Sequence, residues 1–223
     1  DPAMNWRLSG LDRVTLISNS DAHSGAKIGR EANIFDCPLS YKDIIEAIKT
    51  RKGFIGTIEF FPEEGKYHYD GHRICRVRLS PKETISHNYL CPVCGRRVTV
   101  GVMHRVERLA DRPEGFRPDG APPYYSIVPL PEILAEVLKV GPNSKKVEAE
   151  YLRLLSKFGS EFHILMNLPL EELDRENPLL REAIERMRSG RVNISPGYDG
   201  EYGRVRLFEE PERSEFKGQV SMF

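Results

Sequence analysis

Four side chains near the middle of the sequence have the types and the spacing of a metal site. His72 and Cys75 form an H-x-x-C pair, and Cys91 and Cys94 form a C-x-x-C pair after fifteen intervening residues. Three thiolates and one imidazole can close a tetrahedral shell around Zn²⁺ and leave no position open for catalysis. Gly95 suits the turn after the second pair because glycine accepts a positive φ. The spacing therefore predicts a structural zinc site, with buried cysteines or a disulfide as the alternatives.

The remaining histidines and cysteine bear on this prediction. His68, His87 and His104 also lie close enough in the sequence to supply the imidazole in place of His72. Cys37 lies outside the cluster, and we expect it to be a small buried apolar residue. Clustered cysteines are typical of a reducing compartment, so we expect a cytoplasmic protein. A charged-then-apolar leader and an apolar run near twenty residues are both missing, which predicts no signal peptide and no membrane span.

A second candidate site lies near the start of the sequence. Residues 13–18 are a β-branched, apolar run that predicts a strand, and the polar cluster Asn19–Gly25 follows it. This is the end of a strand at which α/β folds place their sites. Asp21 and His23 would leave the same face of an extended chain, where a carboxylate and an imidazole can bind a divalent ion. An ordinary polar loop is the alternative for so short a pattern.

Positive charge is concentrated on the segment that carries the cysteines. The chain has 33 basic and 33 acidic residues, yet residues 66–112 hold ten Lys and Arg against four Asp and Glu. Acidic residues are in excess in the flanking segments. Residues 1–65 hold eight Lys and Arg against ten Asp and Glu, and residues 113–223 hold fifteen against nineteen. A phosphate backbone is the natural partner of such a basic segment, and a solvated basic face is the alternative.

Basic and aromatic side chains are the candidate contacts to DNA. Arginine forks suit phosphates, lysines at a helix N-terminus can hold another, and tyrosines at a hairpin tip can stack on an unpaired base. The predicted contacts are Arg73, Arg76, Arg78, Arg96, Arg97, Lys145, Lys146, Tyr198 and Tyr202. For each one the alternative is an ion pair, a solvated surface or ordinary packing. The arginines would hold the duplex in register and would not read its sequence.

Three domains follow from the pattern of elements and breaks. Residues 1–65 contain a helix over 40–50, capped by Ser40, and a strand over 54–60 that ends in a Pro- and Gly-containing break. Residues 66–112 form the zinc module, which is small enough that metal binding should contribute to its folding. Residues 113–223 begin with a Pro- and Gly-rich stretch and continue into a mainly helical domain. Helices are predicted over 132–140, 144–158, 168–173 and 179–189, and a β-hairpin around Asp199 and Gly200.

Several of these motifs resemble one enzyme family. Ser20–Ser24 (SDAHS), after a hydrophobic run, resembles the last metal-binding motif of PHP-family phosphoesterases. Trp6–Ser9, Tyr67–His72, Cys91–Gly95 and Gly101–Ala110 are similar to endonuclease Q, and the resemblance covers essentially the whole chain. It implies an α/β fold, namely the end of a distorted (β/α)₇ PHP barrel, followed by a zinc-ribbon-like module and a mainly helical C-terminal domain with a β-hairpin.

The resemblance also implies an activity. The family cleaves DNA on the 5′ side of deaminated bases (uracil, hypoxanthine or xanthine) and abasic sites, with metal-activated water. Asp21 and His23 would be catalytic ligands of divalent ions (Zn, Mn or Mg) at the PHP site. The H-x-H motif that opens such a barrel does not precede Asp21. The chain is therefore expected to be the C-terminal half, to need the N-terminal half of its own PHP domain as a partner, and to be inactive alone.

Two other functions and one further partner fit parts of the sequence. A non-enzymatic DNA-binding zinc module tied to a helicase or sliding clamp would explain the basic segment. A PHP phosphatase acting on small phosphoesters would explain Asp21 and His23 but not the long basic segment. At the end of the chain, Gln219 and Met222 have the spacing that begins a sliding-clamp binding motif, and a chance match is the alternative.

Overall fold

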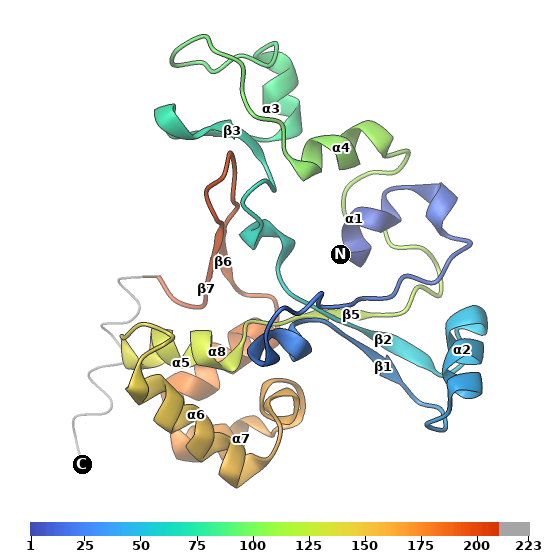
Figure 1. Ribbon diagram of the computed structural model, residues 1–223, viewed down its shortest axis with the longest axis vertical. Helices are drawn as coiled ribbons and strands as arrows, with labels where there is room; N and C mark the ends of the chain where they lie inside the picture. The colour runs from blue at the N-terminus through green and yellow to red at the C-terminus, as the bar shows by residue number, and fades with distance from the viewer. Residues whose placement is uncertain (210–223) are drawn as a thin grey trace. The chain divides into compact units, whose positions relative to one another are not determined.

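Residues 1–209 are described in a computed structural model of the chain (Figure 1). The chain divides into two compact units, which are described separately below. The first unit combines residues 1–125 with residues 195–204, and the second combines residues 126–194 with residues 205–209. Both boundaries predicted from the sequence, after residues 65 and 112, fall within the first unit and stay predictions.

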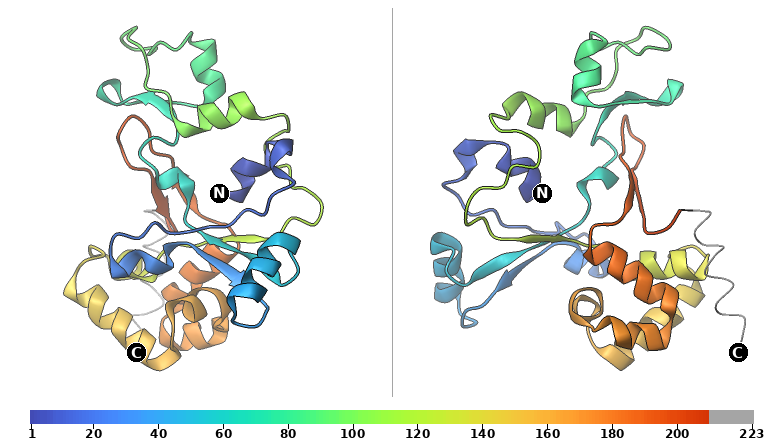
Figure 2. Two further views of the ribbon diagram at one scale, coloured as in Figure 1. Left: turned by 45° about the vertical axis from the view of Figure 1, so that its right-hand side comes forward. Right: turned by 180° about the vertical axis from the view of Figure 1, so that it is seen from behind.

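A three-stranded sheet forms one part of the first unit. Its strands are β1 (Ala32–Phe35), β2 (Phe54–Glu59) and β5 (Tyr124–Ser126), in the order β1-β2-β5. β1 and β2 are antiparallel, and they run side by side in both views of Figure 2. The predicted strand over 54–60 is thereby confirmed. Side chains of β2 supply most of the burial in this sheet, because five of its six residues are buried.

The helix predicted over 40–50 is also confirmed. α2 (Tyr41–Thr50) connects β1 to β2, and the Ser40 side chain accepts a hydrogen bond from the Asp43 amide, as an N-cap does. The apolar stripe of this helix is only half-buried, and Ala47 is its one buried residue. α2 therefore gains little stability from packing against the described part of the chain.

The strand predicted over residues 13–18 is not formed. After α1 (Pro2–Trp6) and η1 (Ser9–Leu11), the chain is irregular up to η2 (Gly25–Arg30). A side chain takes the place of a strand partner: Asn33 accepts from the Ser18 amide at 2.9 Å and donates to the Ser18 carbonyl at 2.6 Å. The β-branched composition is typical of a strand, but at Ser18 both backbone hydrogen bonds are made by an amide side chain.

A second small sheet carries the cysteine cluster. β3 (Asp70–His72) and β4 (Val77–Leu79) are antiparallel, and the short turn η4 (Arg73–Cys75) joins them. Helices α3 (Pro81–Ser86) and α4 (Val102–Leu109) follow, and η3 (Pro62–Glu64) precedes the sheet. The apolar core here is very small and consists of Leu79, Cys91 and Val98, with Cys75 and Val77 packed against it. Such a core favours a fold that depends on metal binding.

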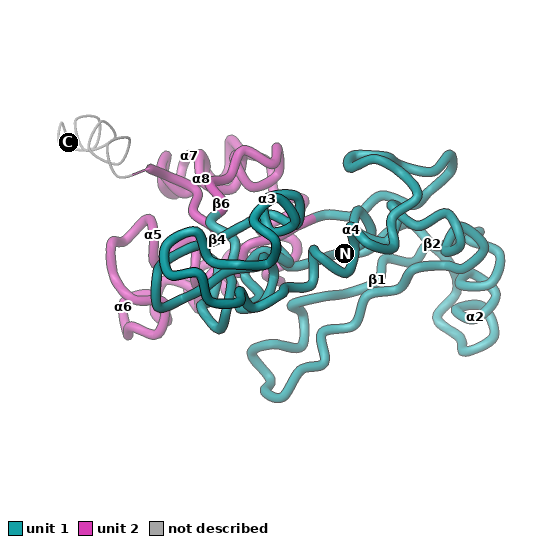
Figure 3. The backbone as a smooth tube through the Cα atoms, turned by 90° about the horizontal axis from the view of Figure 1, so that it is seen from above, with its two compact units in different colours: residues 1–125, 195–204 teal, residues 126–194, 205–223 magenta. Residues whose placement is uncertain are grey.

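The second unit is a helical bundle. Its elements are α5 (Leu130–Leu138), α6 (Lys145–Phe158), the short π-helix η5 (His163–Asn167), α7 (Leu170–Glu176) and α8 (Pro178–Arg188). The predicted helices are confirmed, with ends that differ by at most three residues. A continuous apolar core holds them together, and its fully buried members include Leu130, Ile133, Leu134, Leu154, Ile164, Leu173, Leu180 and Ile184. Figure 3 shows the two units as separately coloured parts of the trace.

The predicted hairpin is present as β6 (Asn193–Ser195) and β7 (Arg204–Arg206). Its tip, residues 195–204, belongs to the first unit although the preceding helices belong to the second. Among residues 1–209, the structure has no helix whose length and apolar content would let it cross a membrane.

Candidate metal centre and nucleic-acid interface

The four predicted ligands come together. One ligand atom from each of His72, Cys75, Cys91 and Cys94 lies within 4.8 Å of all the others, and His72 Nδ1 is 3.5 Å from Cys94 Sγ. Within residues 1–209 this is the only group of three or more His, Cys, Asp or Glu side chains with such spacing. The cluster could therefore hold one metal ion.

Each pair of ligands is presented by a tight turn that ends in a left-handed residue. η4 ends at Arg76, whose φ is 54°, and the second turn ends at Gly95, whose φ is 69°. The second turn is closed by hydrogen bonds from the Gly95 amide to the Cys91 carbonyl (2.8 Å) and from the Cys91 amide to the Arg96 carbonyl (2.7 Å). Two short turns thus aim four side chains at one point, as the spacing predicts.

The thiols of the cluster differ in acidity. Hydrogen bonding to Cys94 and burial raise the pKa of Cys75 to about 11. Burial opposes ionisation of Cys91, but backbone amide hydrogen bonds from Cys94 and Val93 prevail and lower its pKa to about 7. A bound divalent ion requires all three sulfurs as thiolates, so binding would release protons.

The other histidines near the cluster have different roles. His104 is buried, and its Nδ1 lies 2.7 Å from the Asp70 carboxylate while its Nε2 lies 3.2 Å from the Tyr89 hydroxyl. His68 is also buried and bonds through Nδ1 to the Pro62 carbonyl at 3.0 Å. His87 is exposed at the end of α3. His72 is thus the histidine that the fold places beside the sulfurs.

Asp70 anchors the metal module from inside. This carboxylate is fully buried, and besides His104 it accepts a hydrogen bond from the Gly101 amide at 2.7 Å. Gly101 caps the N-terminus of α4, so Asp70 ties β3 to that helix. Sequence reasoning did not identify Asp70, because a single Asp inside a Tyr- and His-rich segment has no pattern of its own.

Asp21 and His23 lie on the surface in an irregular segment. Asp21 has a φ of 45°, so the extended geometry expected for the pair is not adopted, and His23 Nδ1 lies 2.8 Å from the Asp21 carbonyl. A carboxylate that the sequence did not single out lies in the adjacent sheet: Glu59 is buried and accepts hydrogen bonds from the hydroxyls of Ser18 (2.8 Å) and Thr57 (2.5 Å). The assignment of Asp21 and His23 as metal ligands stays a prediction.

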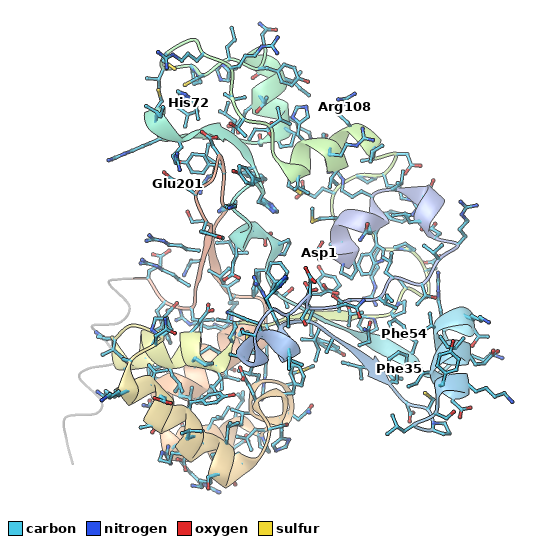
Figure 4. All side chains as sticks on the ribbon, in the orientation of Figure 1. Asp1, Phe35, Phe54, His72, Arg108 and Glu201 are labelled. Carbon is cyan, nitrogen blue, oxygen red and sulfur yellow. The ribbon has the colours of Figure 1, made fainter. Side chains whose placement is uncertain are left out.

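The tip of the hairpin is fastened to the first metal-binding turn. Asp199 accepts hydrogen bonds from the Arg73 amide (2.6 Å) and from the Thr99 hydroxyl (2.5 Å). Tyr198 packs against Gly71, where an added Cβ would collide with the tyrosine ring. Figure 4 shows Glu201 on this hairpin and His72 at the end of β3. The hairpin tip is therefore a structural part of the metal module.

The predicted DNA contacts fall into three places. Arg76, Arg78, Tyr198 and Tyr202 line one polar cavity of about 510 Å³, together with Ser195, Pro196, Glu201 and Arg204. Arg73, Arg96 and Arg97 are exposed on the turns that carry the ligands, outside the lining of that cavity. Lys145 and Lys146 are exposed in the first turn of α6, in the second unit. Gln219 and Met222 lie outside the described residues.

The two tyrosines differ in their freedom. Tyr198 is half-buried against Gly71, whereas Tyr202 is 73% exposed. Tyr202 is thus the better placed of the two for stacking on a base. Arg204 was missed by sequence reasoning, because it lies at the start of a short strand far from the basic segment.

Sequence comparison finds relatives along almost the whole chain. A family profile described as the MJ0043 C-terminal domain matches residues 129–191, which contain α5 to α8. The uncharacterized protein MJ0043 of Methanocaldococcus jannaschii is 33% identical over 97% of this chain and 28% of its own length. The uncharacterized protein YqxK of Bacillus subtilis is 30% identical over 92% of this chain and 50% of its own length.

Structural comparison gives the fold a solved counterpart. The lesion-specific endonuclease PfuEndoQ of Pyrococcus furiosus superposes with a TM-score of 0.86 and 32% identity over 100% of this chain and 56% of its own. An endonuclease Q bound to a 27-mer duplex with an abasic lesion at its active site superposes with a TM-score of 0.79 and 33% identity. That match covers 94% of this chain and 54% of the other. The resemblance to endonuclease Q that the motifs predict is confirmed. The chain spans between about a quarter and about half of the lengths of these proteins.

Proposed function

We propose that this chain is part of a DNA-repair endonuclease and supplies its metal module, its helical C-terminal unit and the segment with Asp21 and His23. The observation that carries the proposal is the match to PfuEndoQ along the entire chain, at a TM-score of 0.86 and 32% identity. The basic metal module supports it, because a nuclease that acts on duplex DNA needs an extended track for phosphates.

The proposed reaction is cleavage of the phosphodiester on the 5′ side of a deaminated base or an abasic site. A second structure similar to this chain is an endonuclease Q with an abasic duplex at its active site. Asp21 and His23 would hold divalent ions (Zn, Mn or Mg) with ligands from outside this chain. Ions held there would lower the pKa of a bound water and stabilise charge on the phosphate. Taking a mispaired deaminated base out of the stack costs less than taking out a paired one, which adds selectivity.

The isolated chain is proposed to bind DNA without cutting it. Asp21 and His23 supply two donors, and within residues 1–209 they are not joined by a third ligand at metal-binding distance. The test is incubation of the chain and of its full-length protein with abasic and uracil duplexes in Mg²⁺, Mn²⁺ or Zn²⁺. We expect cleavage by the full-length protein only. Robust metal-dependent cleavage by the chain would refute the proposal that it cannot cut DNA alone. Absence of cleavage by both proteins would refute the proposed endonuclease function.

The ion of the cysteine cluster is proposed to be zinc in a structural role. Three sulfurs and one imidazole match the donors that Zn²⁺ takes in closed sites. X-ray absorption at the zinc edge of the metal-loaded chain should show three sulfurs at about 2.3 Å and one nitrogen at about 2.0 Å. A shell dominated by oxygen would contradict this assignment.

Two further proposals concern partners and a rival function. Gln219 and Met222 are proposed contacts to a sliding clamp, and a clamp pull-down indifferent to Gln219→Ala would contradict this. The rival is a non-enzymatic DNA-binding module, which the exposed, two-donor arrangement of Asp21 and His23 favours. Cleavage by the full-length protein that is lost in Asp21→Asn would exclude the rival.

A further inference from the structure

We propose that the cavity between the hairpin tip and β4 is a binding site for one backbone phosphate of a nucleic-acid strand. The inference rests on the proposed function and adds a residue, Arg204, that no motif indicates. The cavity has a volume of about 510 Å³, and it collects arginines from two distant parts of the chain: Arg76 and Arg78 at β4, and Arg204 at β7.

Positive charge exceeds negative charge in the lining of this cavity. Three guanidinium groups line it against a single carboxylate, that of Glu201. Among residues 1–209, none of the three arginines forms an ion pair with Asp or Glu. The Glu201 carboxylate interacts with the Tyr198 hydroxyl. Burial, the negative charge of Glu201 and the hydrogen bond to it together raise the pKa of Tyr198. Like charges in excess repel one another, so the site is completed by an anion.

One arginine of the cavity, Arg78, is held in place before any ligand arrives. Arg78 donates through Nη1 to the Ser195 hydroxyl (2.9 Å) and the Pro196 carbonyl (3.1 Å), which fixes its guanidinium and leaves its other edge for a ligand. Arg76 directly precedes β4 in a left-handed conformation, Arg78 lies within β4, and both line the cavity. Arg76 also directly follows Cys75 in the first metal-binding turn. A planar guanidinium fixed in this way can bind two phosphate oxygens at once.

The rim of the cavity indicates which phosphate compound binds. Tyr202 is 73% exposed there, and the Lys66 amine lies 5.7 Å from the centres of both the Tyr202 and Tyr67 rings. An exposed aromatic face beside a cluster of cations suits a nucleotide, whose phosphate and base can be bound together. Inorganic phosphate would use only the arginines, and an acidic peptide would leave the aromatic rim unused.

The number of phosphates can be counted from the salt dependence of binding. Each phosphate contact on duplex DNA contributes about 0.9 to the slope of log affinity against log salt. We expect Arg204→Gln and Arg76→Gln each to weaken binding of the metal-loaded chain to an abasic duplex by about tenfold. If both arginines bind one phosphate, the double variant loses a slope of about 0.9, whereas separate phosphates would cost about 1.8. Arg204→Lys should keep the slope and lose affinity, because it keeps the charge without the fork.

Controls separate this inference from the proposed function. Arg105→Gln makes the same charge change at an exposed position of α4 outside the cavity. We expect its slope of log affinity against log salt to equal that of the wild type within experimental error. Equal losses of DNA affinity in Arg105→Gln and Arg204→Gln would overturn the single-phosphate site. So would a double variant whose salt slope falls by about 1.8. So would variants that lose inorganic phosphate binding, measured by calorimetry, but bind DNA normally. If the wild-type chain bound no DNA and the full-length protein cut none, the proposed function itself would fail.

Discussion

Removal of the Asp70 carboxylate should unfold the metal module more readily than loss of any exposed charge. Asp70 is fully buried and is the acceptor for two donors, the Gly101 amide and His104 Nδ1, both at 2.7 Å. Asp70→Ala leaves both donors without a partner in a site closed to water. Each unsatisfied buried donor costs about 1–3 kcal/mol. For two donors we therefore expect a loss of about 2–6 kcal/mol in the free energy of unfolding.

Asp70→Asn is the graded variant. Its amide oxygen can still accept from Gly101, and its amide nitrogen can donate to His104 if the imidazole changes tautomer. We expect a loss of about 1–2 kcal/mol, because one charge-assisted hydrogen bond becomes a neutral one.

The assay is chemical denaturation in saturating zinc, followed by fluorescence of Trp6, the single tryptophan, which lies in the first unit. Asp36→Ala is the matched control, because Asp36 is exposed. It should stay within about 0.5 kcal/mol of the wild type. An Asp70→Ala protein within about 1 kcal/mol of the wild type, or an equal loss in the control, would refute this reasoning.

Three more predictions concern other parts of the chain. Gly71→Ala should release the hairpin tip and expose Tyr198 to quenchers, because the new Cβ collides with the tyrosine ring and with the Val77 carbonyl. Gly10→Ala is the control, because that glycine has open space around it and no positive φ, and it should leave Tyr198 shielded. Arg188→Met should destabilise the helical unit by about 1.5–3 kcal/mol in thermal unfolding, since its guanidinium donates to the Ile164, Leu165 and Leu168 carbonyls; an unchanged transition would contradict it. Burial lowers the pKa of His68 below its ordinary 6.5, so the unfolded chain takes up this proton first and the free energy of unfolding falls as pH drops through 6.5. An NMR titration midpoint for His68 at or above 6.5 would count against that.

Local features of the site could be predicted from the sequence. The H-x-x-C and C-x-x-C spacing determines which side chains a tight turn can aim at one ion, so the cluster of His72, Cys75, Cys91 and Cys94 was found without knowledge of the fold. The hairpin and the helices of the second unit were predicted for the same reason, since caps, turn residues and apolar periodicity act over a few residues.

Long-range features could not be predicted in the same way. The contact between Asp199 and the Arg73 amide joins residues 126 positions apart, and no local pattern signals it. Arg204 joins the arginine cavity only because the hairpin folds back onto β4. In the segment expected as a strand over residues 13–18, side chains from distant residues bond the backbone: Asn33 bonds Ser18, and Arg51 donates to the Val14 carbonyl. Tertiary partners, which composition does not contain, decided each of these cases.

The most direct measurement is the affinity of this chain for an abasic duplex before chelation, after chelation and after zinc is added back. The arginines that would hold the DNA are positioned by turns that converge on the metal cluster. Chelation should therefore weaken DNA binding, and zinc should restore it, because metal binding contributes to the folding of the turns that carry these arginines. Equal affinity in all three states would show that the metal does not organise the DNA-binding surface and would contradict the proposal at its centre.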